Sequence, residues 1–445
     1  MKNRFDIGIY AEMLLPMVKE EGEVLRKKFI GISDGKIVEI SPWQPKRKGE
    51  CKKFIDGTGK VCLPSFVNGH VHMAMSLMRG LEDDVDFHTW LFEKILPLEQ
   101  GLVCRDFVRA GTELAALECI RFGVTTVNEM YFFSEESAKA ILKAGMRGIV
   151  SQAFSGFDLP EDRDLGRDKG KVFRYLHKKF AKEDRMIIGL GPHAPYSCDD
   201  QMLGEVRELA KEYSAPIHIH VSETAKEVHD SLERYKKSPV ARLEELGILQ
   251  KNTLCAHCVH LNEEDIKIFK KSGASVLYNP DSNMKLGSGV APVSEYLRQQ
   301  IPVSIGTDGA ASNNDLSIFG AMDIGTKLQK LQSGDSRAMT ARQALWMGTH
   351  GGAKALGLEA IIGSVEVGKS ADLVLVDLNF PHLQPMDDPY SHLVYSATGL
   401  EVDTVLCAGR VLLANKKHLS LDAKKIIASA NRWRKKIGEF LKKQH

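Results

Sequence analysis

Two histidines separated by one residue, His70 and His72, follow the apolar run of residues 61–69. In an extended strand, residues two apart point to the same side, so both imidazoles face one point. Two neutral imidazoles form half of a metal site suited to zinc or a similar first-row ion. With 15 histidines in 445 residues, such a pair also arises by chance, as two polar residues at a strand end. The rest of the chain decides between these two readings.

Four further apolar segments each stop at a residue that can carry out chemistry. They stop at His193, at His220 with Glu223 close behind, at His257 and at Asp308. Functional side chains at the carboxyl ends of successive strands are typical of a parallel β/α barrel. The alternative is a set of buried strands that each end at a polar residue by chance, and this chance event would have to occur in all four segments. We therefore expect these side chains to meet at one end of a barrel.

The spacing of the apolar segments fits such a barrel. Eight of them are candidate strands, near residues 64–69, 124–130, 147–153, 186–192, 217–220, 253–257, 275–279 and 303–307. The segments between them carry helical patterning. The stretch from His70 to Asp308 is close to the roughly 250 residues typical of these barrels. No Gly-x-Gly-x-x-Gly follows a strand, which disfavours a doubly wound dinucleotide-binding sheet. The sequence predicts an α/β fold built on a (β/α)8 TIM-type barrel.

The two ends of the chain carry β patterning of their own. Residues 29–33 and 36–40 flank Asp34-Gly35, a β-hairpin signal, and residues 371–376 and 403–407 are apolar strands near the other end. Neither end is long enough for an independent sheet core, so we expect both to combine into one small, discontinuous β-sandwich. The predicted domains are a first sandwich part at 1–63, a metal-dependent β/α barrel at 64–362, and a second sandwich part with a basic, solvated C-terminal helix at 363–445.

Composition narrows the class of protein. The net charge of +2, from 60 basic and 58 acidic residues, gives no general attraction to nucleic acid or membranes. No apolar stretch reaches transmembrane length, and the first residues lack a signal-peptide core. The eight cysteines are scattered, which suits a reducing cytoplasm, and we interpret Cys255 and Cys258 as packing residues. We expect a cytoplasmic enzyme with no nucleic-acid or membrane partner, and a closed homo-oligomer as for most such enzymes.

Several longer motifs carry a resemblance to a known family. They are Pro-Ser-Phe-Val-Asn-Gly-His-Val-His at 64–72, Met-Arg-Gly-Leu-Glu-Asp-Asp at 78–84, Trp90-Leu91 with Pro97-Leu98-Glu99, Gly-Pro-His-Ala-Pro-Tyr at 191–196, His-Val-Ser-Glu-Thr at 220–224, Ala-His-Cys-Val-His at 256–260, Asn-Pro-Asp-Ser-Asn-Met-Lys-Leu-Gly at 279–287 and Gly-Thr-Asp-Gly-Ala-Ala-Ser-Asn-Asn at 306–314. In these motifs the chain resembles the amidohydrolase superfamily. Within its deaminase and chlorohydrolase branch, it is similar to the 5′-methylthioadenosine/S-adenosylhomocysteine deaminases.

The resemblance implies one divalent metal ion, bound by four residues: His70, His72, His220 and Asp308. Binuclear members bridge their metals with a modified lysine, and His193 stands at that position here. Zinc is the expected ion, and this donor set also accepts Fe²⁺, Ni²⁺ or Mn²⁺. His218 would point to the same side as His220, and we interpret it as an inner-barrel filler beneath the site.

The resemblance also implies a reaction. It is hydrolytic deamination of the 6-amino group of 5′-substituted adenosines by metal-bound hydroxide, giving the inosine analogue and ammonia. The substrates of this class are 5′-methylthioadenosine, 5′-deoxyadenosine, S-adenosylhomocysteine and adenosine. Glu223 suits proton transfer to the ring nitrogen, His257 orients the hydroxide, and Asp308 passes a proton to the leaving amine. As alternatives, Glu223 caps a helix or His257 is a fifth ligand.

Substrate contacts follow from the same resemblance. Trp90 is expected to pack near the substrate, Glu99 to accept both ribose hydroxyls, and His193 to contact the purine, with Glu223 and Asp308 also touching it. A carboxylate can accept two adjacent hydroxyl donors, so Glu99 would select an intact vicinal diol. The alternatives are a core aromatic for Trp90 and a solvated helix charge for Glu99.

One position departs from the family. Where close relatives place an arginine that holds the homocysteine carboxylate, this chain has Gln152, which brings no charge. Arg163 or Arg167 in the following polar loop is an open substitute. We therefore expect a neutral 5′-substituted adenosine to be preferred over S-adenosylhomocysteine.

Two other functions remain open from the sequence. One is a deaminase or chlorohydrolase of another aminated heterocycle, of the guanine or triazine type, with the same metal set. Glu223 favours deamination, and Glu99 favours a ribosylated substrate. The other is a non-catalytic scaffold on the same fold, although such proteins lose metal ligands that this chain retains.

Overall fold

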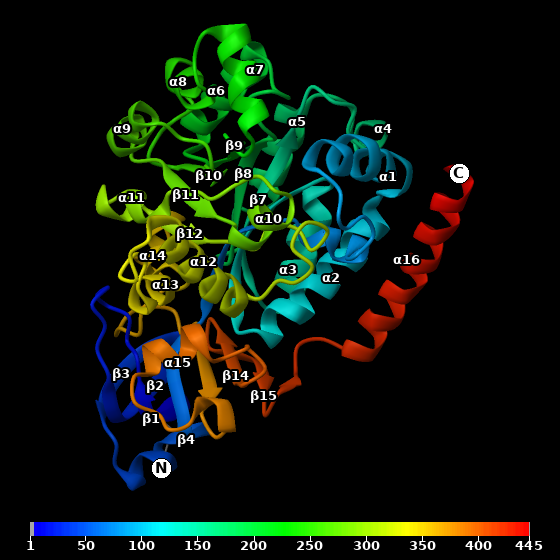
Figure 1. The fold of residues 1–445 in the computed structure, drawn as a ribbon. Coiled ribbons are helices and arrows are strands. Elements are labelled where there is room, and N and C mark those ends of the chain that lie inside the picture. The colour runs from blue at the N-terminus through cyan, green and yellow to red at the C-terminus, as the bar shows by residue number, and fades with distance from the viewer. Residues whose placement is uncertain (1–3, 445) are drawn as a thin grey trace.

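The computed structural model describes residues 4–444 and contains two eight-stranded sheets, of which the upper one in Figure 1 is wholly parallel. The strands of this parallel sheet are β5 (Phe66–Val71), β6 (Val124–Tyr131), β7 (Arg147–Phe154), β8 (Met186–Pro192), β9 (Ile217–Val221), β10 (Thr253–His257), β11 (Ser275–Tyr278) and β12 (Val303–Ile305). Each strand pairs with its neighbours in chain order. Nearly every residue in them is buried, as expected for parallel strands covered on both faces.

The first and last strands of this sheet meet and close it into a barrel. The backbone N–H groups of Thr307 and Asp308 donate to the carbonyl oxygen of His70 at 3.1 and 2.9 Å. Gly306 permits this approach, because a Cβ there would lie 2.7 Å from His70 N. The closure therefore places the chemistry-bearing ends of β5 and β12 side by side.

Helices cover the outside of the barrel (Figure 1), most of them between successive strands and α12 to α14 after the last strand. They are α2 (Arg105–Arg121), α3 (Ser134–Ala144), α4 (Asp162–Leu165), α5 (Lys169–Phe180), α6 (Asp200–Tyr213), α7 (Ala225–Tyr235), α8 (Pro239–Glu245), α9 (Glu263–Ser272), α10 (Pro280–Lys285), α11 (Val293–Arg298), α12 (Ile318–Ser333), α13 (Ala341–Met347) and α14 (His350–Ala355). Several begin at a side chain that caps the free N–H groups, such as Asn262 before α9 and Thr340 before α13.

The connection after β5 is longer and irregular. It contains the 3-10 helix η2 (Met73–Met78), the π-helix η3 (Thr89–Ile95) and the short helix α1 (Leu96–Leu102). Trp90 and Leu98 of this segment are buried in one apolar cluster with Met75 and Ile437. The segment is therefore folded back onto the barrel.

The second sheet joins both ends of the chain. Its strands are β1 (Phe5–Leu14), β2 (Leu25–Ser33), β3 (Lys36–Pro42), β4 (Cys51–Pro64), β13 (Leu373–Asp377), β14 (Val402–Cys407), β15 (Arg410–Ala414) and β16 (Lys417–His418), with η1 (Pro45–Glu50), η4 (Pro381–Leu383) and α15 (Pro389–Tyr395) beside them. β4 lies between β1, which it pairs in parallel, and β13, which it pairs antiparallel. One residue, Ser65, separates β4 from β5, so the second sheet leads directly into the barrel.

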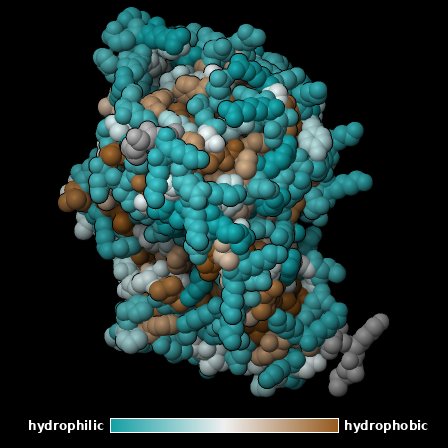
Figure 2. Space-filling model, turned by 90° about the vertical axis from the view of Figure 1, so that its right-hand side faces the viewer, coloured by the Kyte–Doolittle hydropathy of each residue, from teal (hydrophilic) through white to brown (hydrophobic). Residues whose placement is uncertain are grey.

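The C-terminal helix α16 (Ala423–Gln444) runs along the side of the barrel and packs against α2. Two residues of α16 make this contact: Ile437 is fully buried, and Trp433 meets Phe107 of α2 edge to face. Viewed from the side that carries α16, the surface is mainly hydrophilic (Figure 2), and the lysines and arginines of this helix are exposed. No helix among residues 4–444 is long and apolar enough to cross a membrane.

The predicted fold class is confirmed: an α/β barrel with a separate sheet drawn from both termini. All eight barrel strands lie where the apolar segments placed them, and the hairpin of β2 and β3 turns at Asp34-Gly35 as predicted. The domain limits at residues 63 and 362 stay predictions.

Candidate metal and active site

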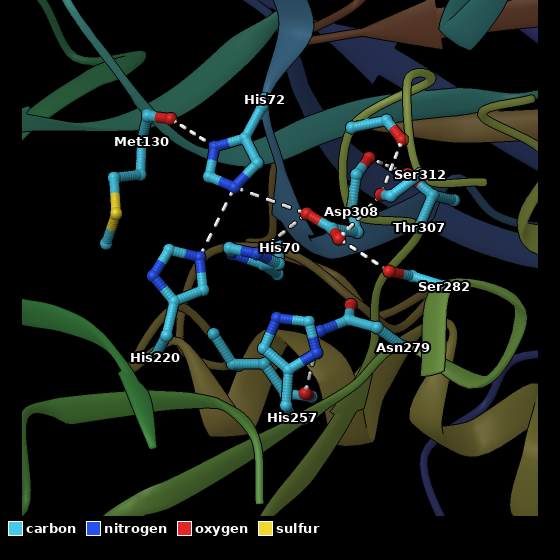
Figure 3. Close-up of polar contacts among 12 residues, drawn as sticks. His70, His72, Met130, His220, His257, Asn279, Ser282, Thr307, Asp308 and Ser312 are labelled. Carbon is cyan, nitrogen blue, oxygen red and sulfur yellow. Dashed lines mark hydrogen bonds and ion pairs between the residues drawn. The ribbon is translucent and has the colours of Figure 1, made fainter. Parts of the chain in front are cut away.

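Five side chains converge at the carboxyl ends of four barrel strands. His70, His72, His220, His257 and Asp308 point toward one another in Figure 3. The ligand atoms of His70, His72 and His220 lie within 4.8 Å of each other, and so do those of His70, His257 and Asp308. Asp308 Oδ1 lies 3.2 Å from both His70 Nε2 and His72 Nε2. The structure thus brings together every residue that the sequence proposed as a ligand, with His257 beside them.

The imidazole orientations suit a cation. His220 Nδ1 lies 2.7 Å from the carbonyl oxygen of His193, and His72 Nδ1 bonds to the carbonyl of Met130. A carbonyl can only accept, so both Nδ1 atoms carry a proton and both Nε2 atoms present lone pairs. These two Nε2 atoms lie 3.3 Å apart. Lone pairs facing each other beside a carboxylate need a positive charge between them, and a divalent metal ion supplies it.

The carboxylate of Asp308 is held at both oxygens. While Oδ1 faces the histidines, Oδ2 accepts hydrogen bonds of 2.7 Å from Ser282 and Ser312. Burial alone would raise the pKa of Asp308, but His70 and His72 hold it well below its usual range. This strong pairing marks Asp308 as an anion at neutral pH.

Glu223 and His257 stand next to the histidine cluster. The two side chains are 3.7 Å apart, from Glu223 Oε1 to His257 Nδ1. His257 Nδ1 also lies 2.8 Å from Asn283 Oδ1, which leaves His257 Nε2 facing the cluster. Burial raises the pKa of Glu223, which makes this carboxyl a better proton carrier near neutral pH.

A buried glutamate fixes the turn that carries Glu223. The two oxygens of Glu227 accept the backbone N–H groups of Ser222 and Glu223 at 2.9 and 2.8 Å. Ser222 has a φ of 51°, in the left-handed region, and these hydrogen bonds hold it there. Glu223 is thereby aimed into the pocket rather than used as a helix cap, because Thr224 is the N-cap of α7.

A pocket with about 800 Å³ of space opens above the cluster. His72, His193, His220, Glu223, His257 and Asp308 line its floor, and Trp90, Glu99, Tyr131, Phe157 and Leu159 are among its other lining residues. His193 donates to or accepts from Ser197 through Nδ1, and its ring lies 5.1 Å from that of His220. All of the predicted substrate residues therefore face one cavity.

Glu99 is buried in this cavity, with 2 % of its surface exposed. The alternative considered from the sequence, in which Glu99 is a solvated charge on a helix, is therefore wrong. Tyr131 donates a hydrogen bond of 2.6 Å to Glu99 Oε1. Burial raises the pKa of Glu99 to about 7, although the hydrogen bond from Tyr131 opposes it.

Gln152 lies outside the pocket. Its side chain is fully buried and Nε2 donates to Glu161 Oε1 at 2.6 Å. The same carboxylate lies 3.2 Å from Lys169 Nζ and accepts the backbone N–H of Phe133. Gln152 thus helps to fix the loop after β7.

Arg163 and Arg167 line a separate, more polar pocket. It has about 690 Å³ of space and shares Leu159 with the cavity above the histidine cluster. Arg167 pairs with Asp158 in the same pocket. Neither arginine lines the cavity that contains Glu99 and Asp308.

Several residues of the site have no distinct signal in the sequence. Tyr131 lies at the end of β6, and nothing in its neighbourhood distinguishes it from a core tyrosine. Asn283 and Ser282 lie within the motif at residues 279–287, so their involvement could have been suspected, but their partners could not. Phe157 and Leu159 belong to an irregular loop whose path only the structure gives.

Comparison with protein families gives one match over most of the chain. The model described as "Amidohydrolase family" matches residues 61–412. This range contains both ends of the barrel and all of the residues that converge in the candidate site.

Two curated relatives are similar over nearly their whole length. A 5-methylthioadenosine/S-adenosylhomocysteine deaminase from Thermoanaerobacter pseudethanolicus is 40 % identical over 421 residues, covering 94 % of this chain and 96 % of the relative. A 5′-deoxyadenosine deaminase from Methanosphaera stadtmanae is 40 % identical over 408 residues, covering 91 % and 94 %.

A solved structure extends the likeness to three dimensions. A zinc-bound crystal structure of an adenosine deaminase from Xanthomonas campestris superposes with a TM-score of 0.94 at 34 % identity. The match covers 99 % of this chain and 100 % of that one.

Proposed function

Because the chain belongs to the amidohydrolase family, we propose that it is a metal-dependent hydrolase that deaminates 5′-substituted adenosines. The products are the corresponding inosine and ammonia. The observation that carries this proposal is the shared cavity. One end holds four imidazoles, Asp308 and the proton carrier Glu223, and the same cavity also contains the buried carboxylate of Glu99.

We assign one divalent ion per chain to His70, His72, His220 and Asp308. The facing lone pairs of His72 and His220, and the two nitrogens beside Asp308 Oδ1, support this ligand set. Zinc is the ion we propose, since three imidazoles and one carboxylate suit it, and Fe²⁺, Ni²⁺ or Mn²⁺ would also be accepted. When bound, such an ion acts as a Lewis acid that makes water a stronger nucleophile at neutral pH.

The chain's own residues handle the protons. With Nδ1–H donated to Asn283, His257 Nε2 offers a lone pair to the attacking water and orients it toward C6 of the purine. Glu223, with its raised pKa, gives a proton to the ring nitrogen beside C6. Asp308 accepts a proton from the attacking water and delivers it to the amino group. The C6–N bond then breaks and ammonia leaves. The remaining proton of the new C6 hydroxyl returns to Glu223, and the oxygen stays on the ring as a carbonyl.

Recognition of the nucleoside follows from the other lining residues. Glu99 accepts the two ribose hydroxyls, because a buried carboxylate with a single hydroxyl donor has room for a diol. Trp90 packs against the nucleoside, and His193 contacts the purine from the end of β8. A free base would leave Glu99 buried without these partners, which favours a ribosylated substrate over guanine or a triazine.

A neutral 5′ group fits the remaining wall. Phe157 and Leu159 contribute apolar surface there, while Gln152 is turned away and both Arg163 and Arg167 line the neighbouring pocket. We therefore propose 5′-methylthioadenosine and 5′-deoxyadenosine as better substrates than S-adenosylhomocysteine, whose carboxylate finds no cation in this cavity.

A substrate panel tests the proposal. Ammonia release and the absorbance change from adenine to hypoxanthine would be followed with metal-loaded enzyme on 5′-methylthioadenosine, 5′-deoxyadenosine, adenosine, S-adenosylhomocysteine, guanine and melamine. Turnover of the adenosines is the expected result. Silence on all adenosines with activity on a free base would overturn the roles of Trp90 and Glu99. A closed homo-oligomer and a cytoplasmic location stay predictions.

A further inference from the structure

We infer that His218 is a positioning residue that selects the metal-binding tautomer of His70. His218 lies in β9, two residues before His220, and is fully buried beneath the cluster. Its Nε2 atom lies 2.8 Å from His70 Nδ1, and the two rings meet edge to face with centroids 4.9 Å apart. The inference rests on the proposed function, because it assumes that His70 is a ligand.

A hydrogen bond between two imidazoles can run in either direction, and the direction decides what His70 does. If His70 Nδ1 carries the proton, its Nε2 atom has a free lone pair directed toward Asp308 and the other histidines. If His218 Nε2 carries the proton, neutral His70 must hold its own proton on Nε2 and has no lone pair for a metal ion.

Asn128 settles the direction. Its side-chain amide lies 2.8 Å from the carbonyl oxygen of Gly69, which can only accept, so the atom in that contact is Nδ2. The same Nδ2 lies 3.4 Å from His218 Nε2. A second donor placed against an N–H group would be repelled, so His218 Nε2 bears a lone pair and accepts from His70 Nδ1–H.

The arrangement explains a histidine at a position that packing alone would fill with an apolar residue. Its nearest strand neighbour in β10 is Leu254, part of the apolar inner cluster of the barrel. If His218 only filled the barrel interior, as the sequence suggested, it would not need a nitrogen that accepts a hydrogen bond from His70. A partner that fixes the second nitrogen of a ligand histidine commonly changes metal affinity by about 10- to 100-fold.

Zinc affinity of the apoenzyme tests the inference. The variant His218→Leu removes the acceptor, whereas His218→Gln keeps one near the position of Nε2. Dissociation constants would be measured by competition with a chromophoric chelator. We expect His218→Leu to bind zinc about 10- to 100-fold more weakly than the parent enzyme and His218→Gln to recover most of that loss.

The matched control is Leu254→Ala, which disturbs the same level of the barrel without touching a ligand. It should lower thermal stability and leave zinc affinity unchanged. Parent affinity in His218→Leu, or equal weakness in His218→Gln, would overturn the role of His218. If the parent enzyme itself takes up no zinc, the metal site of the proposed function fails, and this inference fails with it.

A spectroscopic readout reports the protonated nitrogen in the parent enzyme directly. In ¹⁵N-histidine-labelled, zinc-loaded parent enzyme, long-range ¹H–¹⁵N correlation reports which nitrogen of each imidazole is protonated. The His218 signal, assigned by its loss in His218→Gln, is expected to show a protonated Nδ1 and a bare Nε2. A proton on His218 Nε2 would refute the inference.

Discussion

Tyr131 donates its hydroxyl to Glu99 across 2.6 Å, although β6 and α1 reach the pocket by different routes. The contact gives the buried carboxylate one fixed donor and leaves its remaining lone pairs for a ligand. The proposed recognition of the ribose thus involves Tyr131 as well as Glu99.

Tyr131→Phe should lower kcat/KM for 5′-deoxyadenosine by about 10- to 100-fold, since a hydrogen bond to a charged group contributes about 1.5–3 kcal/mol. Glu99→Gln should cost more, because it removes the charge itself. The check is steady-state kinetics with 5′-deoxyadenosine and its 2′,3′-dideoxy counterpart. The dideoxy compound should be a poor substrate of the parent enzyme and lose little further in either variant. Equal losses of kcat/KM on both compounds would show that Glu99 does not bind the ribose hydroxyls.

Glu223→Gln should lower kcat by about 10²- to 10⁴-fold, the usual contribution of a positioned proton carrier. The amide keeps the shape of the side chain but cannot transfer the proton. Bound metal, measured by elemental analysis, should stay at the parent level. Glu264→Gln, an exposed helix position, serves as the matched control and should be fully active. Loss of metal in Glu223→Gln would instead make Glu223 part of the ligand set.

Removal of the metal should abolish activity reversibly. Dialysis against a strong chelator is expected to eliminate turnover, and titration with zinc should restore it with an end point of one ion per chain. His72→Ala should lower both bound zinc and turnover, because it removes one of the facing lone pairs. Full activity in protein with negligible metal content would contradict the assignment, and an end point of two ions would correct the stoichiometry.

Lys169→Met should destabilise the fold by about 3 kcal/mol, because it leaves the fully buried carboxylate of Glu161 without its cation. The double variant Lys169→Met/Glu161→Gln removes both charges and should recover part of this loss. Urea unfolding of the parent, both single variants and the double variant gives the coupling energy. Additive effects would mean that Lys169 and Asp162, its second partner, form the pair that matters.

Asp281 should make the protein less stable as the pH rises from about 4 to 7. Burial, with Asp315 nearby, raises the pKa of Asp281 to about 7, whereas an unfolded aspartate titrates near about 3.9. Between these values the folded state holds the extra proton, so the free energy of unfolding falls with rising pH. Asp281→Asn should flatten this slope and melt higher than the parent at pH 8 but not at pH 4. Parallel melting curves against pH would contradict it.

The barrel could be predicted from the sequence because its strands are buried on both faces. Runs such as Thr253–His257 are continuously apolar up to their last residue, so both the strand and the reactive side chain at its end are visible. The histidines at the strand ends are visible by the same rule, whereas the proposed choice of His220 over His218 as a ligand came from the family resemblance. The hairpin of β2 and β3 was equally accessible, since Asp34-Gly35 supplies the turn.

The contacts that refine the site could not be predicted. Tyr131 and Glu99, or His257 and Asn283, belong to different elements, and nothing local in the sequence pairs them. The same holds for Gln152, whose amide could have faced the substrate but bonds to Glu161. Glu99 lies on a helix only seven residues long, where patterning could not tell a buried carboxylate from a solvated one. The direction of the hydrogen bond between His70 and His218 depends on Asn128, which belongs to a third strand, β6.

The position of β4 between β1 and β13 has a consequence for biosynthesis. A ribosome releases β1 to β4 first, then the entire barrel, and only afterwards the strand that covers the second edge of β4. Until then that edge offers unpaired N–H and C=O groups to any other nascent chain. Translation that stalls within the barrel therefore leaves an incomplete, aggregation-prone sheet. The yield of folded protein then depends on rapid synthesis of β13 and the residues after it, or on a chaperone that covers the exposed edge.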